Sequence, residues 1–184
     1  MKFENLGMDG VFICTPTVFR DERGCFYESF NYREFTKQSG LQPQFVQDNH
    51  SVSRYGVLRG LHFQQGEYAQ AKLVRVFTGA VLDCIVDLRS GSKTYGQYIG
   101  VHLSADTKQQ LFVPRGFAHG FVVLSEYAEF GYKCDNYYHK EAEGGLRWND
   151  PTLAIDWRIP ETDVVVSSKD AVLPHLSELD RDLF

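Results

Sequence analysis

The sequence has no long apolar segment, no internal repeat and no low-complexity linker. No stretch approaches the roughly 20 apolar residues that a membrane-spanning helix requires, and the opening residues MKFENLGMDG lack the basic and apolar regions of a secretory signal. We therefore expect a cytoplasmic protein with no membrane partner. Because 184 residues can enclose one substantial core but are few for two, we expect one domain spanning residues 1–184.

The sequence also lacks an excess of basic residues. Twenty-four acidic residues face nineteen basic ones, and the formal net charge is -5. A nucleic-acid-binding surface depends on clustered cations that contact phosphates, so this balance argues against nucleic acid as a partner. Any anionic ligand must then be bound by a local cluster of basic side chains.

Paired cysteine motifs are absent as well. The four cysteines are far apart, and no CxxC pattern of a redox or zinc site occurs: Cys14, Cys25, Cys84 and Cys134. We expect all four to be buried, reduced side chains that behave as small apolar residues.

Short segments rich in Val, Ile, Phe and Tyr are plentiful, and glycines separate them. This pattern predicts many short strands, which we expect over residues 11–19, 24–30, 45–53, 57–64, 72–88, 95–103, 109–113, 117–124 and 127–135. Within residues 72–88, Thr78 and Gly79 interrupt two strand-forming runs and predict a hairpin. Strands and helices do not alternate, so an all-β, antiparallel barrel or jelly roll with a few short helices is favoured over a parallel α/β fold.

One helix is expected within FNYREFTKQSG, residues 30–40. Asn31 can cap its first turn with Glu34 three residues later, and Gly40 supplies a C-terminal stop. A second, short helix is expected near residues 176–181.

Lys72 shares the parity of Val74 and Val76 along one predicted strand. Side chains of equal parity face the same side of a sheet, so the ammonium group is expected to point into the barrel. A buried ammonium without a partner is costly, and an inward lysine therefore implies a bound anion, a carboxylate partner or a wet pocket. The alternative is that the opposite face is buried and Lys72 is solvated.

The segment VLRGLHFQQG brings Arg59 and His62 together around Gly60. Without a side chain, Gly60 lets the strand kink or lets a ligand approach closely. A cation and a titratable imidazole would then share one neighbourhood. From this segment alone, two alternatives remain: His62 could be a hydrogen-bonded structural residue, and Arg59 could be a surface charge.

The segment FVPRGFAHGF combines a tight turn with a strand that carries His119. Its PxGxxH spacing resembles the second metal-binding motif of the cupin barrels. A cupin metal site also needs an HxH pair and a carboxylate on an earlier strand. The corresponding strand offers only His62, so we expect no metal.

Eight blocks, taken together, carry a family resemblance. They are FxDxRGxFxE at 19–28, QDNHSVS at 47–53, LRGLHFQ at 58–64, KLVRVxxGxxxDxxVDLR at 72–89, VPRGFAHGF at 113–121, YKCDNYY at 132–138, GGLRWNDP at 144–151 and SSKD at 167–170. In this order and spacing they resemble the RmlC-type dTDP-4-dehydrorhamnose 3,5-epimerases of the cupin superfamily, over nearly the whole chain.

The resemblance implies a cupin jelly-roll barrel that inverts carbons 3 and 5 of dTDP-4-dehydro-6-deoxy-D-glucose, giving dTDP-4-dehydro-L-rhamnose without a cofactor. It implies that His62 is the general base, Asp170 its orienting carboxylate and Tyr132 the general acid on the other face of the sugar. Lys72 would stabilise the enolate oxygen.

The same resemblance implies a set of residues that bind the nucleotide-sugar: Arg23, Phe26, Glu28, Gln47, Asn49, Arg59, Lys72, His119, Tyr138, Glu143 and Lys169. Tyr138 matches an aromatic residue that stacks on thymine. Because family members commonly form homodimers by exchanging amino-terminal strands, a homodimer is expected, and some of these residues would act across its interface.

The chemistry of a 4-keto-sugar makes this set of residues intelligible. Removing a proton from carbon 3 or 5 gives an enolate whose charge rests on the carbonyl oxygen. A histidine suits the base because its pKa of about 6.5 lies near working pH, and inversion needs a second donor on the opposite face. Three alternatives remain: inversion at carbon 3 only or on another nucleotide-sugar, a metal-dependent cupin, and a non-catalytic carbohydrate-binding module.

Overall fold

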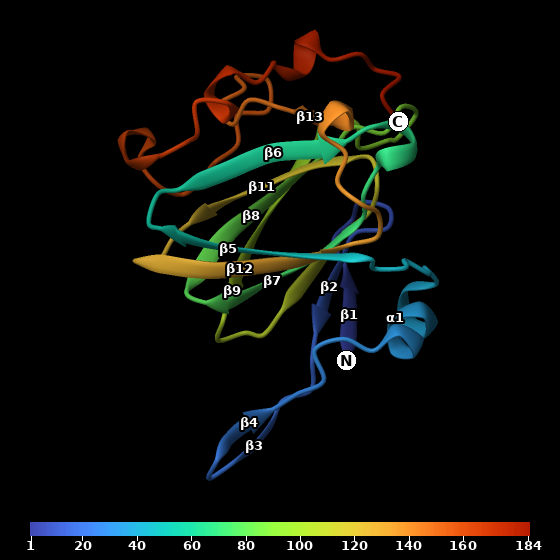
Figure 1. Ribbon diagram of the computed structural model, residues 1–184, viewed down its shortest axis with the longest axis vertical. Coiled ribbons are helices and arrows are strands. Elements are labelled where there is room, and N and C mark those ends of the chain that lie inside the picture. The colour runs from blue at the N-terminus through green and yellow to red at the C-terminus, as the bar shows by residue number, and fades with distance from the viewer.

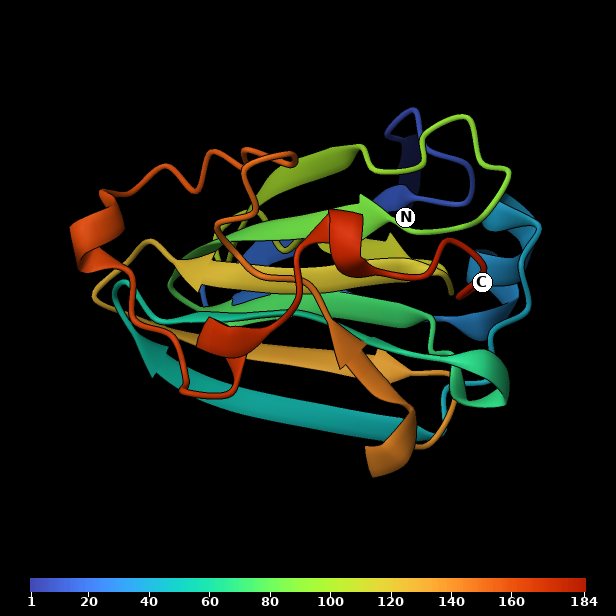
Figure 2. The same cartoon turned by 90° about the horizontal axis from the view of Figure 1, so that it is seen from above.

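Two antiparallel sheets packed face to face form the body of the protein (Figures 1 and 2), in a computed structural model that describes residues 1–184. The six-stranded sheet has the order β1 (Lys2–Asn5), β2 (Phe12–Thr15), β10 (Gln110–Val113), β7 (Lys72–Thr78), β12 (Tyr127–Cys134) and β5 (Gln47–Arg54). The five-stranded sheet has the order β13 (Glu143–Gly145), β6 (Leu58–Gln64), β11 (Phe117–Val123), β8 (Ala80–Asp87) and β9 (Tyr98–Ser104). The expected all-β, antiparallel fold is confirmed.

A two-stranded hairpin extends away from both sheets (Figure 1). It consists of β3 (Phe19–Asp21) and β4 (Gly24–Phe26), and we call residues 19–26 the arm. Phe19 is 63% exposed and Phe26 is 71% exposed. The arm therefore leaves two large aromatic side chains without a core to pack against.

Helix α1 (Tyr32–Ser39) forms where it was expected. The Asn31 side chain accepts a hydrogen bond of 3.2 Å from the Glu34 amide, and Gly40 ends the helix in the left-handed region at φ 72°. Phe35 is fully buried on its inner face. The prediction is therefore confirmed at both ends.

The second expected helix is only a single 3-10 turn, Leu176–Glu178. Leu176 and Leu179 both pack against the cluster outside the five-stranded sheet. A spacing of three residues suits a 3-10 turn, which aligns positions i and i+3, and gives no reason to extend an α-helix. The other 3-10 turns are Gly66–Tyr68, Lys140–Ala142, Glu161–Asp163 and Asp170–Val172.

None of these helices combines the length and the apolar character needed to cross a membrane.

The predicted hairpin within residues 72–88 is wrong, because β7 and β8 belong to different sheets. At Gly79 the backbone has a φ of 78°, and a Cβ there would lie 2.1 Å from the carbonyl oxygen of Tyr127. Glycine thus permits a crossing between the sheets, at a point where the chain passes close to another loop. The same turn signal fits a hairpin or a crossing.

The remaining strand predictions differ mainly at their ends. The strand expected over 11–19 stops after Thr15, and that expected over 24–30 stops after Phe26. Strands β1, β3 and β13 were not predicted, because strands this short carry little periodic signal. The other expected strands are confirmed to within a few residues.

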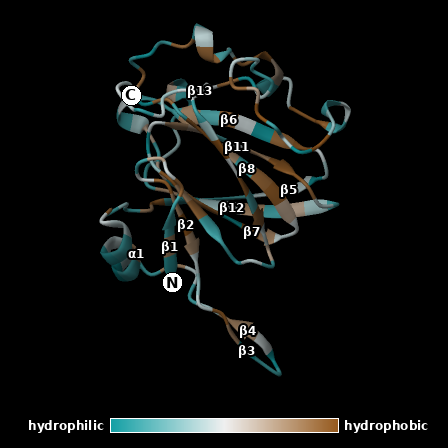
Figure 3. Ribbon diagram, turned by 180° about the vertical axis from the view of Figure 1, so that it is seen from behind, coloured by the Kyte–Doolittle hydropathy of each residue, from teal (hydrophilic) through white to brown (hydrophobic).

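Fifteen buried residues pack together between the sheets. Val74 and Phe130 come from the six-stranded sheet, and Ile85 and Phe121 come from the five-stranded sheet. Figure 3 shows β8 and β11 as mostly apolar strands, whereas α1 is mostly hydrophilic. Burial of each such side chain stabilises the fold by about 1.5–3 kcal/mol relative to exposure. This core occupies part of the inter-sheet space, and a cavity occupies the rest.

A second cluster covers the outer face of the five-stranded sheet. We call residues 146–184 the C-terminal segment; its Leu146 and Trp157 pack on Leu61 and Leu82 of the sheet. Because both faces of this sheet are covered, β8 and β11 are buried along almost their whole length. The packing also brings the end of the chain back over β6, as Figure 1 shows.

The cysteines follow this division of the molecule. Cys14, Cys84 and Cys134 are buried, as expected, but Cys25 is exposed. The expectation was wrong for Cys25 because it lies in the arm, which leaves the core.

The fully buried Asp87 at the end of β8 allows a test of the fold through acid stability. Burial alone would raise the pKa of this carboxyl, but hydrogen bonds from Arg89, Ser92 and Thr94 outweigh that effect and lower the pKa to about 2. The pKa of this carboxyl in the unfolded chain is near 3.9. The ionised carboxylate therefore adds about 2 kcal/mol to the free energy of unfolding at pH values above that pKa, and this contribution is lost as the pH falls towards 2. We expect Asp87→Asn to be less stable by at least about this amount at pH 6.

Urea unfolding of the parental protein and of Asp87→Asn between pH 6 and pH 3 measures this difference. The difference in the free energy of unfolding between the two proteins should become smaller as the pH falls. A gap of constant size over that range would contradict the proposed origin of the stability.

Candidate active site

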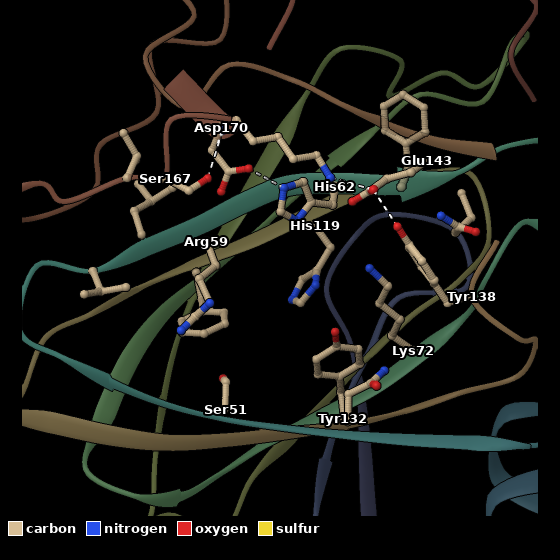
Figure 4. A pocket seen from close by; sticks show the side chains of 18 of the residues that line it. Ser51, Arg59, His62, Lys72, His119, Tyr132, Tyr138, Glu143, Ser167 and Asp170 are labelled. Atoms are coloured by element: carbon tan, nitrogen blue, oxygen red, sulfur yellow. Dashed lines mark hydrogen bonds and ion pairs between the residues drawn. The ribbon is translucent and has the colours of Figure 1, made fainter. Parts of the chain in front are cut away.

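A cavity of about 560 Å³ lies between the two sheets. Inward side chains of β5, β7 and β12 line one wall, and those of β6 and β11 line the other. The C-terminal segment contributes Lys169 to its lining, together with Ser167 and Asp170, which Figure 4 shows at its edge. Charged and polar side chains therefore face a cavity that also borders the apolar core, through Phe121.

His62 and Asp170 form a hydrogen-bonded pair on one side of the cavity. His62 Nε2 lies 2.7 Å from Asp170 Oδ1, and the Gly60 amide donates to Oδ2 of the same carboxylate at 3.3 Å. The side chain of Asp170 is 6% exposed, whereas that of His62 is 31% exposed. The imidazole thus has one nitrogen fixed by a buried carboxylate and a ring that faces the cavity.

Asp170 remains ionised despite its burial. Desolvation alone would raise the pKa of its carboxyl, but hydrogen bonds from His62, the Gly60 amide and Ser167, together with the charge of His62, hold that pKa below its ordinary value. A carboxylate in this state accepts the Nε2–H of the imidazole and so fixes its tautomer and orientation.

Lys72 points into the cavity from β7, as its parity predicted. The residue is 8% exposed, and its ammonium lies 5.8 Å from the ring centroid of Tyr132. Burial lowers the pKa of Lys72, and the nearby Cys134, Asp83 and Glu143 partly offset that effect. Because no carboxylate lies within ion-pair distance of it, a cation is available to an anion in the cavity.

Tyr132 stands on β12, in the sheet opposite His62. Burial is the main reason that its pKa rises to about 12. Its hydroxyl is therefore protonated at neutral pH. The cavity thus has a proton donor on one sheet and an imidazole on the other.

Two further positively charged side chains lie at the cavity, Arg59 and Lys169. The Arg59 Nε donates a hydrogen bond of 3.1 Å to Ser53 Oγ on β5, and Lys169 forms an ion pair with Glu143. The Tyr138 hydroxyl donates to the same Glu143 carboxylate at 2.8 Å. The two contacts of Glu143 tie the C-terminal segment to the loop before β13 at the mouth of the cavity.

Gln47 links that mouth to the interior. Its side-chain carbonyl accepts a hydrogen bond of 3.0 Å from the Tyr138 amide, and its Nε2 donates to Asn49 Oδ1 at 3.0 Å. Asn49 lies directly opposite Tyr132 in the β5–β12 register and lines the cavity. Gln47 itself lies just outside the lining.

His119 also lines the cavity, and it has a partner that the sequence reasoning missed. Its Nε2 lies 3.0 Å and 3.1 Å from the two oxygens of Asp83, which is fully buried on β8. Asp83 shares the parity of Val81 and Ile85. The parity argument used for Lys72 would therefore have identified it.

Three expected binding residues are not brought to this cavity. Arg23 and Phe26 lie on the exposed arm, where the Arg23 guanidinium bonds to Asp21. Glu28 is exposed beside α1 and accepts a hydrogen bond from Asn31. Within a single chain, most of the expected binding residues thus lie at or beside the cavity, whereas these three are exposed on the arm and beside α1.

This arrangement is suited to proton transfer at carbon next to a carbonyl. An imidazole and a phenol approach from opposite sheets, and a buried ammonium lies near the phenol. Such a cation stabilises developing oxyanion charge most strongly where water is excluded.

Comparison with known proteins identifies the family. Residues 5–178 match the family described as dTDP-4-dehydrorhamnose 3,5-epimerase. The dTDP-4-dehydrorhamnose 3,5-epimerase of Escherichia coli (strain K12) is 56% identical over 175 residues, which cover 95% of this chain and 94% of that protein.

Solved structures agree with this match. The crystal structure of dTDP-4-dehydrorhamnose 3,5-epimerase from Elizabethkingia anophelis NUHP1 has a TM-score of 0.94 and 54% identity, covering 97% of each chain. The Legionella pneumophila dTDP-6-deoxy-D-glucose-3,5-epimerase, in complex with dTDP-4-keto-L-rhamnose, has a TM-score of 0.94 and 48% identity, covering 99% of this chain and 96% of that one. The chain therefore belongs to the dTDP-4-dehydrorhamnose 3,5-epimerase family.

Proposed function

We propose that this chain inverts carbons 3 and 5 of dTDP-4-dehydro-6-deoxy-D-glucose, giving dTDP-4-dehydro-L-rhamnose. The observation that carries the proposal is the pairing, across one cavity, of an oriented imidazole with a protonated phenol. His62 belongs to the five-stranded sheet and Tyr132 to the six-stranded sheet, so a ring between them meets a base on one face and an acid on the other.

His62 acts as the general base at each carbon in turn. Its Nε2 bonds to Asp170, which leaves Nδ1 free to take a proton from carbon. Asp170 fixes that tautomer and stabilises the imidazolium that forms. The electron pair of the broken C–H bond moves into the ring, and negative charge collects on the oxygen of carbon 4.

Lys72 stabilises that oxygen. Its buried ammonium lies near Tyr132 and has no carboxylate within ion-pair distance, so an enolate oxygen can serve as its counter-charge. Tyr132 then returns a proton to the opposite face of the carbon, which inverts the centre. Water from the cavity mouth restores the phenol, and His62 releases its proton to solvent.

The nucleotide end of the substrate is held at the cavity mouth. Arg59 has a guanidinium suited to paired hydrogen bonds with the diphosphate, and Lys169 adds a second positive charge. Tyr138 is half exposed, so one face of its ring is available for a thymine base. Gln47, Asn49, His119 and Glu143 complete the set by positioning these side chains or the sugar.

The arm supplies the remaining residues to a second copy of the chain. Arg23 and Phe26 do not line the cavity of their own chain, and Phe19 and Phe26 are exposed. In a homodimer the arm would cover those aromatic side chains and add the Arg23 cation to the partner's diphosphate site, with Glu28 close behind.

Deuterium exchange tests the proposed reaction. In deuterated water, we expect the dTDP-4-keto-sugar to gain deuterium at carbons 3 and 5, and His62→Ala to slow this exchange by about 10²–10⁴-fold, because no other group replaces the base. The control is His102→Ala, since His102 is exposed on β9 and outside the cavity. NMR measures both positions.

Label at carbon 3 alone would select the single-carbon reaction, and no label would exclude both epimerases. Near-parental exchange by His62→Ala would remove that residue from the mechanism. Because the proposed reaction needs no metal, exchange should also survive treatment with EDTA; a loss there would favour the metal-dependent alternative.

Tyr132→Phe separates proton removal from inversion. Without the hydroxyl, we expect net epimerisation to fall by about 10²–10³-fold while exchange changes by less than about tenfold, because the base stands on the opposite sheet. The ratio of exchange to product formation is measured by NMR in one reaction. Equal loss of both activities would show that Tyr132 does not act only in proton return.

Mixed dimers test whether the arm completes a partner's site. In a heterodimer of Arg23→Ala and His62→Ala, one cavity has both its own His62 and an intact arm from the partner. A random mixture should therefore recover about a quarter of the parental rate, although each variant alone is weak.

The control pairs His62→Ala with Tyr132→Phe, which lie in the same cavity, so each cavity keeps one defect and no activity returns. Failure of the first mixture to recover, with heterodimers verified by mass spectrometry, would mean that Arg23 serves its own chain or none.

A further inference from the structure

The floor of the cavity contains a second histidine–carboxylate pair beside the first. His119 on β11 lies directly opposite His62 in the β6–β11 register. Each imidazole bonds to a carboxylate through Nε2: His62 to Asp170, and His119 to both oxygens of Asp83. The mechanism above uses the first pair and gives the carboxylate of the second no role.

Burial distinguishes the two pairs. The side chain of His62 is 31% exposed, whereas those of His119 and Asp83 are 6% and 0% exposed. Asp83 has no side-chain hydrogen-bond partner other than His119. A carboxylate so enclosed is costly unless positive charge lies close by. The fold keeps this carboxylate inside the barrel, where an apolar residue would otherwise suffice.

Lys72 is the charge that Asp83 can balance. The titratable groups that act on Lys72, or that lie with it around the Tyr132 ring, come from four strands: Asp83 of β8, His119 of β11, Tyr132 and Cys134 of β12, and Glu143 of β13. Burial raises the pKa of the Cys134 thiol to about 11, so this group is neutral at pH 7. Glu143 already pairs with Lys169. Asp83 is left as the interior carboxylate that no other cation engages.

We propose that Asp83 is a positioning residue that orients His119 for the sugar and balances the charge of Lys72. The proposal rests on the proposed function of this cavity. With Nε2–H donated to Asp83, His119 presents an unprotonated Nδ1, for which the structure gives no protein partner. That nitrogen accepts a hydrogen bond from a sugar hydroxyl, while the more exposed His62 acts as the base.

The variant Asp83→Asn removes the charge and preserves the shape. We expect kcat to fall by about 10–100-fold, the range found for the loss of carboxylates that orient metal-ligating histidines. Asp83 raises the pKa of Lys72, so its removal should also move the basic limb of the kcat–pH profile to lower pH. Affinity for dTDP alone, measured by calorimetry, should change by less than about twofold, because the nucleotide lies at the mouth.

Asp87→Asn is the matched control. Asp87 lies on the same strand and is equally buried, but its carboxylate bonds to Arg89, whereas that of Asp83 bonds to the cavity-lining His119. Measured at a temperature where both variants are folded by circular dichroism, it should keep the parental kcat and pH profile. Equal kcat values and equal pH profiles for the two variants would overturn the proposal.

The tautomer of His119 gives a second measurement that needs neither a variant nor a substrate. Two-bond ¹H–¹⁵N correlation spectra of the parental protein should show the His119 proton on Nε2 with Nδ1 unprotonated. A proton on Nδ1 alone would overturn the proposal even if Asp83→Asn failed to fold. If instead the parental protein exchanged no sugar protons, the proposed function would fail, and the spectrum would still decide whether Asp83 orients His119.

Discussion

The hydrogen bond between His62 and Asp170 joins residues that are 108 positions apart in the chain. The rest of the fold must therefore bring these two residues together. Asp170 stands in a segment with little regular structure. Its place is set by Trp157, Leu146 and other apolar residues that pack on the outer face of the five-stranded sheet. The second hydrophobic cluster thus does more than stabilise the fold, because it brings a carboxylate to the edge of a cavity on the other side of β6.

The same constraint explains why the sequence pattern could place the strand residues of the site but not those on its loops. Parity along one strand placed Lys72 inside the barrel, because alternation is a local property. The same reasoning applied to β8 would have placed Asp83 inside. No local pattern relates SSKD to His62, so Asp170 was assigned only through family resemblance. The positions of Tyr138 and Glu143 at the mouth depend equally on loops whose course the sequence does not reveal.

The fold was predicted well where the signal was short-range, and poorly where partners had to be chosen. Asn31 and Gly40 delimit α1 by their own chemistry, so both ends of the helix were correct. The pattern around Gly79 established that two strands meet there but could not establish whether they pair. The arm shows a second limit of prediction from sequence. Phe19 and Phe26 favour a strand in either case, so their residue types do not reveal whether the surface that covers them belongs to the same chain or to another.

The wrong hairpin and the chemistry of the cavity are connected. If β7 and β8 were paired neighbours, Lys72 and Asp83 would project from a single sheet, and its solvent-facing side could hold both charges at little cost. Because the chain crosses between sheets at Gly79, the two residues lie in opposite walls and act on each other within the barrel. A charge of each sign then enters the interior with a counter-charge opposite, which lowers the cost of burying both. The crossing between the sheets at Gly79 therefore also lowers the free energy of burying charged side chains in the interior.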